Sequence, residues 1–331
     1  MTGLLDRLTR LPRWFERHAP DGVFPTVEWQ VGGHCNYDCS YCIQSRASRV
    51  GQADEATVAS ILGGLASLPG RWDIKMSGGE PFASKRFMTD IIPGLVAHTP
   101  HRISVLTNFS APRTLLERFA TLTGDRLGIV SASLHLESVD AAEFVDKAIW
   151  FKGLRDALCP GSSFVINSVL VPGTVRKMFA IKESVEAAGL RWFPQFMKVK
   201  TGVFPYDADE RRLIEQLVGH SHDPHTVNRA PSYRGHFCHA GAWYFVLDQR
   251  GRAWSCRTAR RHGADLDGDT YSDLSDLGSM VDGTFKLRRA GGPCTFDICP
   301  CTVPANRGIV VGVRRDDPDW GEAAAAARVR P

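Results

Sequence analysis

The sequence has no apolar run that approaches the roughly 20 residues of a membrane-spanning helix, which excludes a protein with helical spans. Its first residues, MTGLLDRLTRLPRWFERH, mix charges with apolar positions, so they do not resemble the apolar core of a secretory signal. The net charge is only +4, and no basic stripe with interleaved aromatic residues is present, so nucleic acid is not an expected partner. These absences favour a cytoplasmic protein without membrane contact.

Six short apolar or β-branched runs alternate with segments of helical spacing between residues 26 and 200. The runs are PTVEWQV, WDIKMS, RISVLT, LGIVSASLHL, SFVINSVLV and RWFPQFM. Apolar residues at helical spacing predict helices over 58–68, 115–122, 144–154 and 178–185. This alternation predicts parallel βαβ units in an α/β fold, which right-handed crossovers would curl into a partial (β/α)6 barrel. In such a sheet the chemistry lies at the carboxyl ends of the strands.

The composition changes from about residue 205, where a polar, loop-like stretch precedes a predicted β-hairpin around 248–251. We therefore expect four parts: an N-terminal amphipathic helix within 1–25, the partial barrel over 26–205, a smaller cysteine-rich domain over 206–305, and a tail over 306–331. The helix would place Leu4, Leu5, Leu8, Leu11 and Phe15 on one side, against the main domain.

Nine cysteines are clustered, at positions 35, 39 and 42, at 159, and at 238, 256, 294, 299 and 301. In a large cytoplasmic protein, clustered cysteines are typical of metal ligands rather than of disulfides, and an odd total fits poorly with complete pairing. The stretch GGHCNYDCSYCIQS directly follows the first predicted strand. A structural zinc site needs four ligands, usually in pairs, whereas Cys35, Cys39 and Cys42 lack an obvious fourth. Three thiolates can hold a four-iron cluster with one iron left open, and His34 is the alternative fourth ligand.

The pair of motifs CNYDCSYC and KMSGGEPF resembles the radical S-adenosylmethionine superfamily. The resemblance implies that Cys35, Cys39 and Cys42 hold a [4Fe-4S] cluster and that its open iron binds S-adenosylmethionine (AdoMet). The reduced cluster then cleaves AdoMet to a deoxyadenosyl radical, which takes a hydrogen atom from the substrate. A flavodoxin or ferredoxin-type electron donor is implied as a partner. Glycines allow close backbone approach, and a carboxylate can accept from the ammonium group of AdoMet. The cofactor-binding residues implied in these motifs are Tyr41, Ser77, Gly78, Gly79, Glu80 and Pro81.

Three further strand ends carry polar residues that are candidates for AdoMet contacts or for structural hydrogen bonds. They are Asn108 after the third strand, Ser133 on the fourth and Asn167 on the fifth. Where the family often has aspartate, this chain has His135. Because residues two apart share a face of a strand, His135 is expected to point into the cavity with Ser133.

The second cysteine group resembles the twitch form of the SPASM extension, which binds an auxiliary iron–sulfur cluster. The resemblance implies one auxiliary [4Fe-4S] cluster held by Cys238, Cys256 and two of Cys294, Cys299 and Cys301. A structural zinc site is the alternative. The remaining thiol, for which Cys301 is the candidate, would be a catalytic hydrogen-atom donor or a bystander.

The overall plan resembles that of antibiotic-pathway aminocyclitol and sugar dehydrogenases and epimerases. Glu28, Gln30, His135, Glu137 and Gln195 are polar candidates to line a cavity, which favours a small polar, carbohydrate-like substrate. The expected outcome is oxidation, epimerisation or decarboxylation, with His135 or Glu137 as the catalytic base. Two alternatives remain: a peptide-modifying enzyme of the same superfamily, and a non-catalytic module stabilised by metal.

Overall fold

A computed structural model describes residues 18–44, 51–199, 202–262 and 275–313. The apolar positions of the expected N-terminal helix, at 4–15, lie outside these ranges, as does most of the expected C-terminal tail. Within the described part of the chain, no helix is both long enough and apolar enough to cross a membrane.

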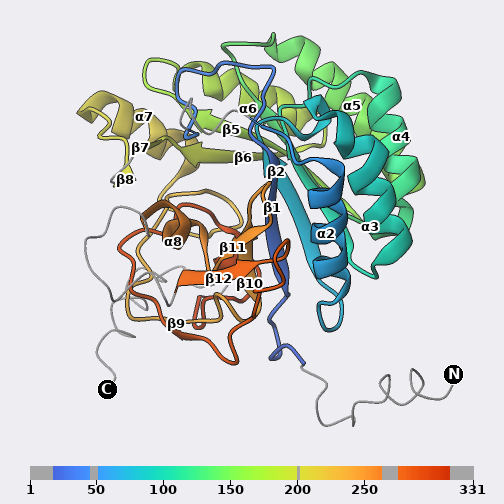
Figure 1. The fold of residues 1–331 in the computed structure, drawn as a ribbon. Helices are drawn as coiled ribbons and strands as arrows, with labels where there is room; N and C mark the ends of the chain where they lie inside the picture. The colour runs from blue at the N-terminus through green and yellow to red at the C-terminus, as the bar shows by residue number, and fades with distance from the viewer. Residues whose placement is uncertain (1–17, 45–50, 200–201, 263–274, 314–331) are drawn as a thin grey trace, which may run out of the picture.

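The described strands form a main sheet in the order β12-β11-β10-β1-β2-β3-β4-β5-β6 (Figure 1). All six predicted strands are confirmed as parallel neighbours. Their bounds are β1 Thr26–Gly32, β2 Asp73–Gly78, β3 Arg102–Thr107, β4 Leu127–Leu134, β5 Ser163–Leu170 and β6 Arg191–Phe196. Pro194 interrupts the backbone donors of β6, which is tolerated because β6 is the edge strand.

Helices connect the parallel strands and cover one face of the sheet (Figure 1). They are α2 Glu55–Ala66, α3 Ile92–His98, α4 Arg113–Thr123, α5 Ala141–Leu158 and α6 Lys177–Ala187. Asp54 and Asp140 begin α2 and α5 as N-caps, because each carboxylate accepts from a backbone N–H of the first turn. The α/β fold with a parallel barrel-like core is therefore confirmed.

The β2–β3 connection contains helical structure that the sequence did not predict. A 3-10 turn, Pro81–Ala83, is followed by a π-helical turn, Phe87–Ile91, that runs into α3. Phe87, Ile91 and Leu95 are fully buried along this segment. Their spacing of four residues is typical of a helix. Pro93 within the first turn of α3 and the wider π turn make this helical pattern hard to recognise in the sequence.

The C-terminal half adds three strands to the main sheet. Strand β10, Tyr244–Leu247, pairs in parallel with β1, and the predicted hairpin joins it to β11, Arg252–Trp254. Strand β12, Asp276–Ser279, completes this edge. Residue 206, the expected boundary, lies in the connection between β6 and these strands.

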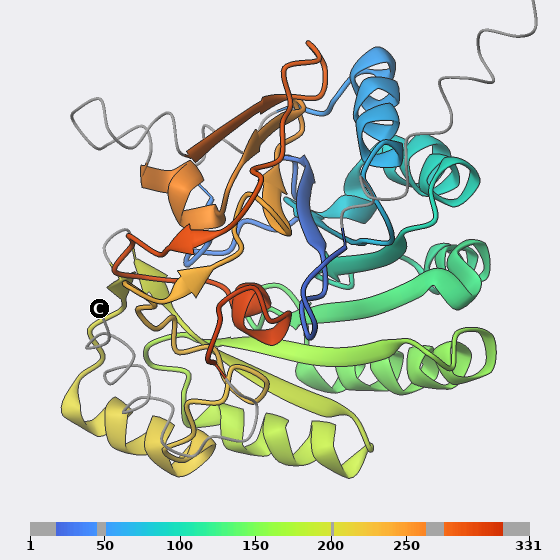
Figure 2. The same ribbon diagram turned by 90° about the horizontal axis from the view of Figure 1, so that it is seen from below.

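Short elements complete the described C-terminal half. They are β7 Lys198–Val199, β8 Gly202–Val203, α7 Ala208–Val218, β9 Phe237–Cys238, α8 Arg257–His262, β13 Gly292–Pro293 and α10 Val303–Asn306. Figure 2 shows α10 within the concavity of the curved sheet. Arg307, just after α10, forms an ion pair with the buried Asp73 on the inner face of β2. The C-terminal chain is thereby anchored inside the barrel.

Replacing Arg307 with alanine should destabilise the protein by about 3 kcal/mol, because Asp73 would keep a buried charge without its partner. The shift of the urea unfolding midpoint at neutral pH measures this effect. Arg212→Ala is the matched control, since Arg212 and Asp209 form an exposed pair on α7 that should contribute little. Equal midpoints for the two variants would contradict a structural role for the Arg307 pair.

Candidate active site

The loop that follows β1 carries Cys35, Cys39 and Cys42, and none of the three forms a disulfide among the residues described. Cys39 is buried, Cys35 is half-buried and Cys42 is exposed. The backbone turns within the group, since the N–H of Cys42 donates to the carbonyl of Cys39 at 3.1 Å. Burial, followed by the charges of Cys35 and Cys42, raises the pKa of Cys39. The three sulfurs are thus close enough to interact electrostatically.

The donor chemistry of this loop fits an iron–sulfur cluster. Among the residues described, no group of three or more His, Cys, Asp or Glu side chains is arranged to hold a metal ion. A four-iron cluster separates its cysteine sulfurs by binding each at a different corner, so it needs less convergence than a tetrahedral zinc ion. Thiolates repel one another less when iron shares their charge. The residues that would hold the cluster are Cys35, Cys39 and Cys42.

Gly78 and Gly79 fix the cysteine loop to the end of β2. The N–H of Gly79 donates to the carbonyl of Gly32 at 2.9 Å, and that of Glu80 donates to the carbonyl of His34 at 2.8 Å. A Cβ on Gly79 would lie 1.8 Å from the carbonyl oxygen of His34, so no larger residue fits there. We expected these glycines to admit a ligand. Their closest neighbour is the cysteine loop itself.

The Glu80 carboxylate lies in the interior and accepts three hydrogen bonds. Oε1 accepts from the Thr107 hydroxyl at 2.6 Å and from the N–H of Phe82 at 3.1 Å, and Oε2 accepts from the N–H of Asn108 at 2.6 Å. Burial raises the pKa of Glu80 to about 7, although these hydrogen bonds lower it. Ser77 is buried at the end of β2, and Pro81 begins the following turn. Glu80 therefore joins the ends of β2 and β3.

Asn108 extends this connection to the cysteines. Its Nδ2 donates to Oδ1 of Asn36 at 2.9 Å and lies 3.9 Å from the Cys35 sulfur. The next residue, Phe109, has a φ of 62°, a left-handed conformation that is rare for a bulky side chain. The Lys147 ammonium stabilises this backbone conformation by donating a hydrogen bond to the Phe109 carbonyl at 2.8 Å. The end of β3 is thus shaped to present Asn108 to the loop.

His135 and Glu137 follow β4 and contact the other side of the cysteine loop. The Tyr41 hydroxyl lies 2.8 Å from Nδ1 of His135, and the two rings stack with their centroids 5.8 Å apart. The Glu137 carboxylate accepts from the Ser40 N–H at 2.7 Å and from its hydroxyl at 2.5 Å. Burial lowers the pKa of His135 to about 4, so the ring is neutral near pH 7. Both expected bases are engaged in positioning the loop.

A ladder of neutral polar groups crosses β4, β5 and β6. The Ser133 hydroxyl donates to Oδ1 of Asn167 at 2.9 Å, and Nδ2 of Asn167 donates to the Ser131 hydroxyl at 2.9 Å. Nε2 of Gln195 also donates to Oδ1 of Asn167, again at 2.9 Å. The structure therefore brings together Ser133, Asn167 and Gln195, which the sequence had listed as separate candidates.

The five C-terminal cysteines gather between short strands and the segment that leads into α10. Strand β13 pairs with β9, which places Gly292 opposite Cys238, and the N–H of Ala259 in α8 lies 3.3 Å from the Cys256 sulfur. Burial, followed by the charges of the other four thiols, raises the pKa of Cys299 well above its usual range. Burial also raises the pKa of Cys238 and of Cys256, each to about 12. These interactions support a shared site for the group.

Cys301 contacts two polar groups of the main sheet. Its sulfur lies 3.6 Å from Oε2 of Glu28 and 3.7 Å from the Tyr244 hydroxyl. The same Glu28 oxygen accepts from Tyr244 at 2.5 Å and from Nε of Arg257 at 2.6 Å. The sequence identified Glu28 but missed Tyr244 and Arg257. Tyr244 lies in the predicted hairpin. Its hydroxyl reaches Glu28 because β10 pairs with β1, and no local sequence pattern predicts that pairing.

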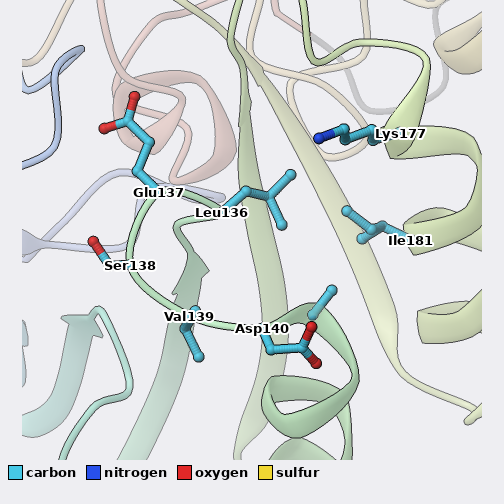
Figure 3. Close-up of a pocket in the computed structure, with 8 residues that line it drawn as sticks. Leu136, Glu137, Ser138, Val139, Asp140, Lys177 and Ile181 are labelled. Atoms are coloured by element: carbon cyan, nitrogen blue, oxygen red, sulfur yellow. The ribbon is translucent and has the colours of Figure 1, made fainter.

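A surface pocket of about 500 Å³ lies apart from both cysteine groups, between the loop after β4 and α6 (Figure 3). In Figure 3 the Leu136 side chain points toward Lys177 and Ile181, whereas the Glu137 carboxylate points away from them. Glu137 is the residue that connects this pocket to the cysteine loop, through Ser40. The pocket contains none of the cysteines, so it is not the candidate site.

Replacing Glu80 with glutamine should remove a pH dependence of stability. The folded-state pKa of about 7 lies above the value of 4.5 for an exposed glutamate, so Glu80 contributes most stability at low pH and loses it as pH rises through 7. Wild-type protein should therefore lose about 3 kcal/mol relative to the variant between about pH 4 and about pH 8. Urea unfolding across this range measures the difference. Glu186→Gln, at an exposed pair with Lys182, is the control. Parallel pH profiles for wild type and Glu80→Gln would refute this role of burial.

No family model matches the sequence, and no curated protein matches it. Solved structures do match. Native anSMEcpe with bound AdoMet and Cp18Cys peptide aligns over 78% of this chain and 79% of its own, at 15% identity and a TM-score of 0.55. SuiB of Streptococcus suis, bound to precursor peptide SuiA, aligns over 80% of this chain and 65% of its own, at 15% identity and a TM-score of 0.54.

A third structure, BtrN in complex with AdoMet and 2-DOIA, aligns over 79% of this chain and 80% of its own at 15% identity. Its TM-score of 0.42 is too low to carry an argument. The first two matches, with TM-scores of 0.55 and 0.54, support the fold of this chain. They are radical S-adenosylmethionine enzymes, and this chain has their fold, as the motifs at 35–42 and 77–81 had indicated.

Proposed function

We propose that the protein is a radical AdoMet enzyme that abstracts hydrogen from a small polar, carbohydrate-like substrate, such as a sugar, an aminocyclitol or a sugar nucleoside of natural-product biosynthesis. The observation that carries the proposal is the polar inner face of the sheet, which lies between the two cysteine groups. Glu28 and Cys301 contact each other on one side of this face, and the Ser133–Asn167–Gln195 ladder crosses the other. Hydroxyl and amide groups of this kind suit a substrate rich in hydroxyls.

Cys35, Cys39 and Cys42 would hold the first cluster, which together with AdoMet supplies the radical that abstracts hydrogen. The chain's own contribution is to position the loop. Gly79, Asn108 and His135, which directly follow β2, β3 and β4, contact it from three directions. Tyr41 stacks on His135, Ser77 and Gly78 end β2, and Glu80 and Pro81 begin the turn that follows. Cys42 is exposed at the protein surface, where a flavodoxin or ferredoxin-type donor can deliver an electron.

Cys238, Cys256, Cys294 and Cys299 would hold the auxiliary cluster, and Cys301 would remain the spare thiol. This assignment is supported by the contacts of Cys301 with Glu28 and Tyr244. A thiol beside the inner face can return a hydrogen atom to a substrate radical, which gives epimerisation. Oxidation requires an electron acceptor and a base instead, and decarboxylation requires a carboxylate beside the radical. Glu137 and His135 act as positioning residues of the loop in this proposal.

The second candidate function is peptide modification, such as thioether formation or epimerisation of a residue. It is favoured by one observation: the two matches with the higher TM-scores have peptides named in their complexes, Cp18Cys with anSMEcpe and SuiA with SuiB. At 15% identity these matches support the fold, so they do not decide between the two substrates.

Anaerobically reconstituted protein should hold about eight irons per chain, as two four-iron clusters, and should cleave AdoMet under reduction. Joint replacement of Cys35, Cys39 and Cys42 with alanine should leave about four irons and abolish cleavage. Iron analysis and chromatography of deoxyadenosine measure the two outcomes. Zinc without sulfide, and no AdoMet cleavage, would instead support a non-catalytic module.

The spare thiol can be identified by comparing two neighbouring cysteines. Cys301→Ala should keep about eight irons, whereas Cys299→Ala should destabilise the auxiliary cluster and lower iron toward about four. With a panel of sugars, aminocyclitols and nucleosides in deuterated buffer, an epimerised product should gain deuterium because thiol hydrogens exchange with solvent. Cys301→Ala should lose this incorporation. Loss of iron in Cys301→Ala would make Cys301 a ligand and overturn the assignment, and a ketone product would indicate dehydrogenation.

A further inference from the structure

Lys75 places an ammonium group on the inner face of the sheet. It lies on β2 in register with Glu28 of β1, and it alternates with Ile74 and Met76, which are fully buried against the helices. Alternation along a strand therefore directs Lys75 away from the helices and toward the concave side. Burial lowers the pKa of Lys75, so keeping this ammonium charged at this position costs folding free energy.

The carboxylates near Lys75 are committed to other cations. Glu28 accepts from Nε of Arg257 at 2.6 Å and from Nη2 at 3.2 Å, and it also accepts from Tyr244. Asp73, below Lys75 on β2, pairs with Arg307. Within the described part of the chain, the Lys75 ammonium makes no hydrogen bond or ion pair within 4.0 Å. The charge of Glu28 acts on the Lys75 ammonium, but the hydrogen bonds of this carboxylate go to Arg257 and Tyr244.

Two arginines of the C-terminal half reach the same region. Arg257 binds Glu28 through Nε and Nη2, which leaves its Nη1 for another acceptor. Arg260 donates a hydrogen bond to Gln30, and its guanidinium lies 5.2 Å from the centroid of the Trp254 ring. Burial lowers the pKa of Arg260, and the negative charge of Asp248 opposes this shift. Around Glu28 the local charge is therefore positive, with Lys75 contributed by β2 and Arg257 and Arg260 contributed by α8.

We propose, building on the function proposed above, that Lys75 binds an anionic group of the substrate, either a phosphate or a carboxylate, with Arg257 beside it. The neutral ladder on β4, β5 and β6 is the opposite wall and suits hydroxyl groups. Together the two walls select a polyol with a single anionic substituent, such as a sugar phosphate or a sugar acid. The lysine ammonium binds a phosphate or a carboxylate as a point charge, without the fixed hydrogen-bond geometry of an arginine.

The test uses reconstituted holoenzyme saturated with AdoMet, and three hexoses as probes: glucose, glucose 6-phosphate and glucuronate. Calorimetric titration should show that at least one anionic hexose binds about tenfold or more tightly than glucose. The preferred anion distinguishes a phosphate from a carboxylate. Lys75→Met should reduce the preferred anion to the affinity of glucose, and Lys75→Arg should retain most of the preference. Thermal unfolding checks that each variant is folded.

Lys182→Met is the matched control, because Lys182 is an exposed lysine paired with Glu186 on α6, and this change should preserve the preference. Equal or undetectable binding of the three hexoses by wild type would overturn the proposal, as would an unchanged preference in Lys75→Met. Binding of the anionic hexose only in a parallel titration without AdoMet would also overturn it, since Lys75 would then serve AdoMet. AdoMet cleavage by wild type is measured separately, so failure of the subsite and failure of the proposed function give different results.

Discussion

The contact between Gly79 and the carbonyl of His34 is the constraint on which the rest of the site depends. It brings the end of β2 against the loop after β1 at a distance that only glycine allows. The loop is then fixed from two further directions, by Asn108 at the end of β3 and by His135 and Glu137 after β4. Three cysteines on an otherwise irregular loop thereby acquire defined positions without a regular element of their own.

The strands and most helices could be predicted because their signals are local. Alternating β-branched and apolar runs specified β1 to β6, and the Cys and Gly motifs lay where strand ends had been expected. Alternation predicted a shared face for Ser133 and His135, but β4 ends at Leu134, so His135 lies in the loop that follows the strand. The π-helical turn before α3 could not be predicted this way, since its residue spacing departs from the period of an α-helix.

What the sequence could not provide were contacts between distant residues. Glu28 and Arg257 are 229 positions apart, and their ion pair depends on the parallel pairing of β1 with β10. The roles of single residues were equally difficult. His135 and Glu137 had the chemistry of bases, yet in the structure they hold Tyr41 and Ser40. A residue's type indicates what it can bind, but only its neighbours determine what it does bind.

Buried ionic groups are costly, and this protein concentrates them on the inner face of the sheet. Breaking such pairs is more damaging than their net contribution suggests, because each lost partner leaves a charge without compensation. The Glu28–Arg257 and Asp73–Arg307 pairs both join the barrel to the C-terminal half. They favour one placement of that half over others, in which these charges would be buried alone.

The position of α10 inside the concave sheet has a consequence for biosynthesis. Every strand of the main sheet is translated before residues 299–307, which supply the last auxiliary cysteines and Arg307. The barrel therefore emerges from the ribosome with an open side and with Asp73 uncompensated. Native pairing of β1 with β10 must also wait for more than half of the chain, and such long-range pairing is slow. All the clustered cysteines thus emerge before Arg307, the residue that ties the segment after α10 to the inner face of the sheet.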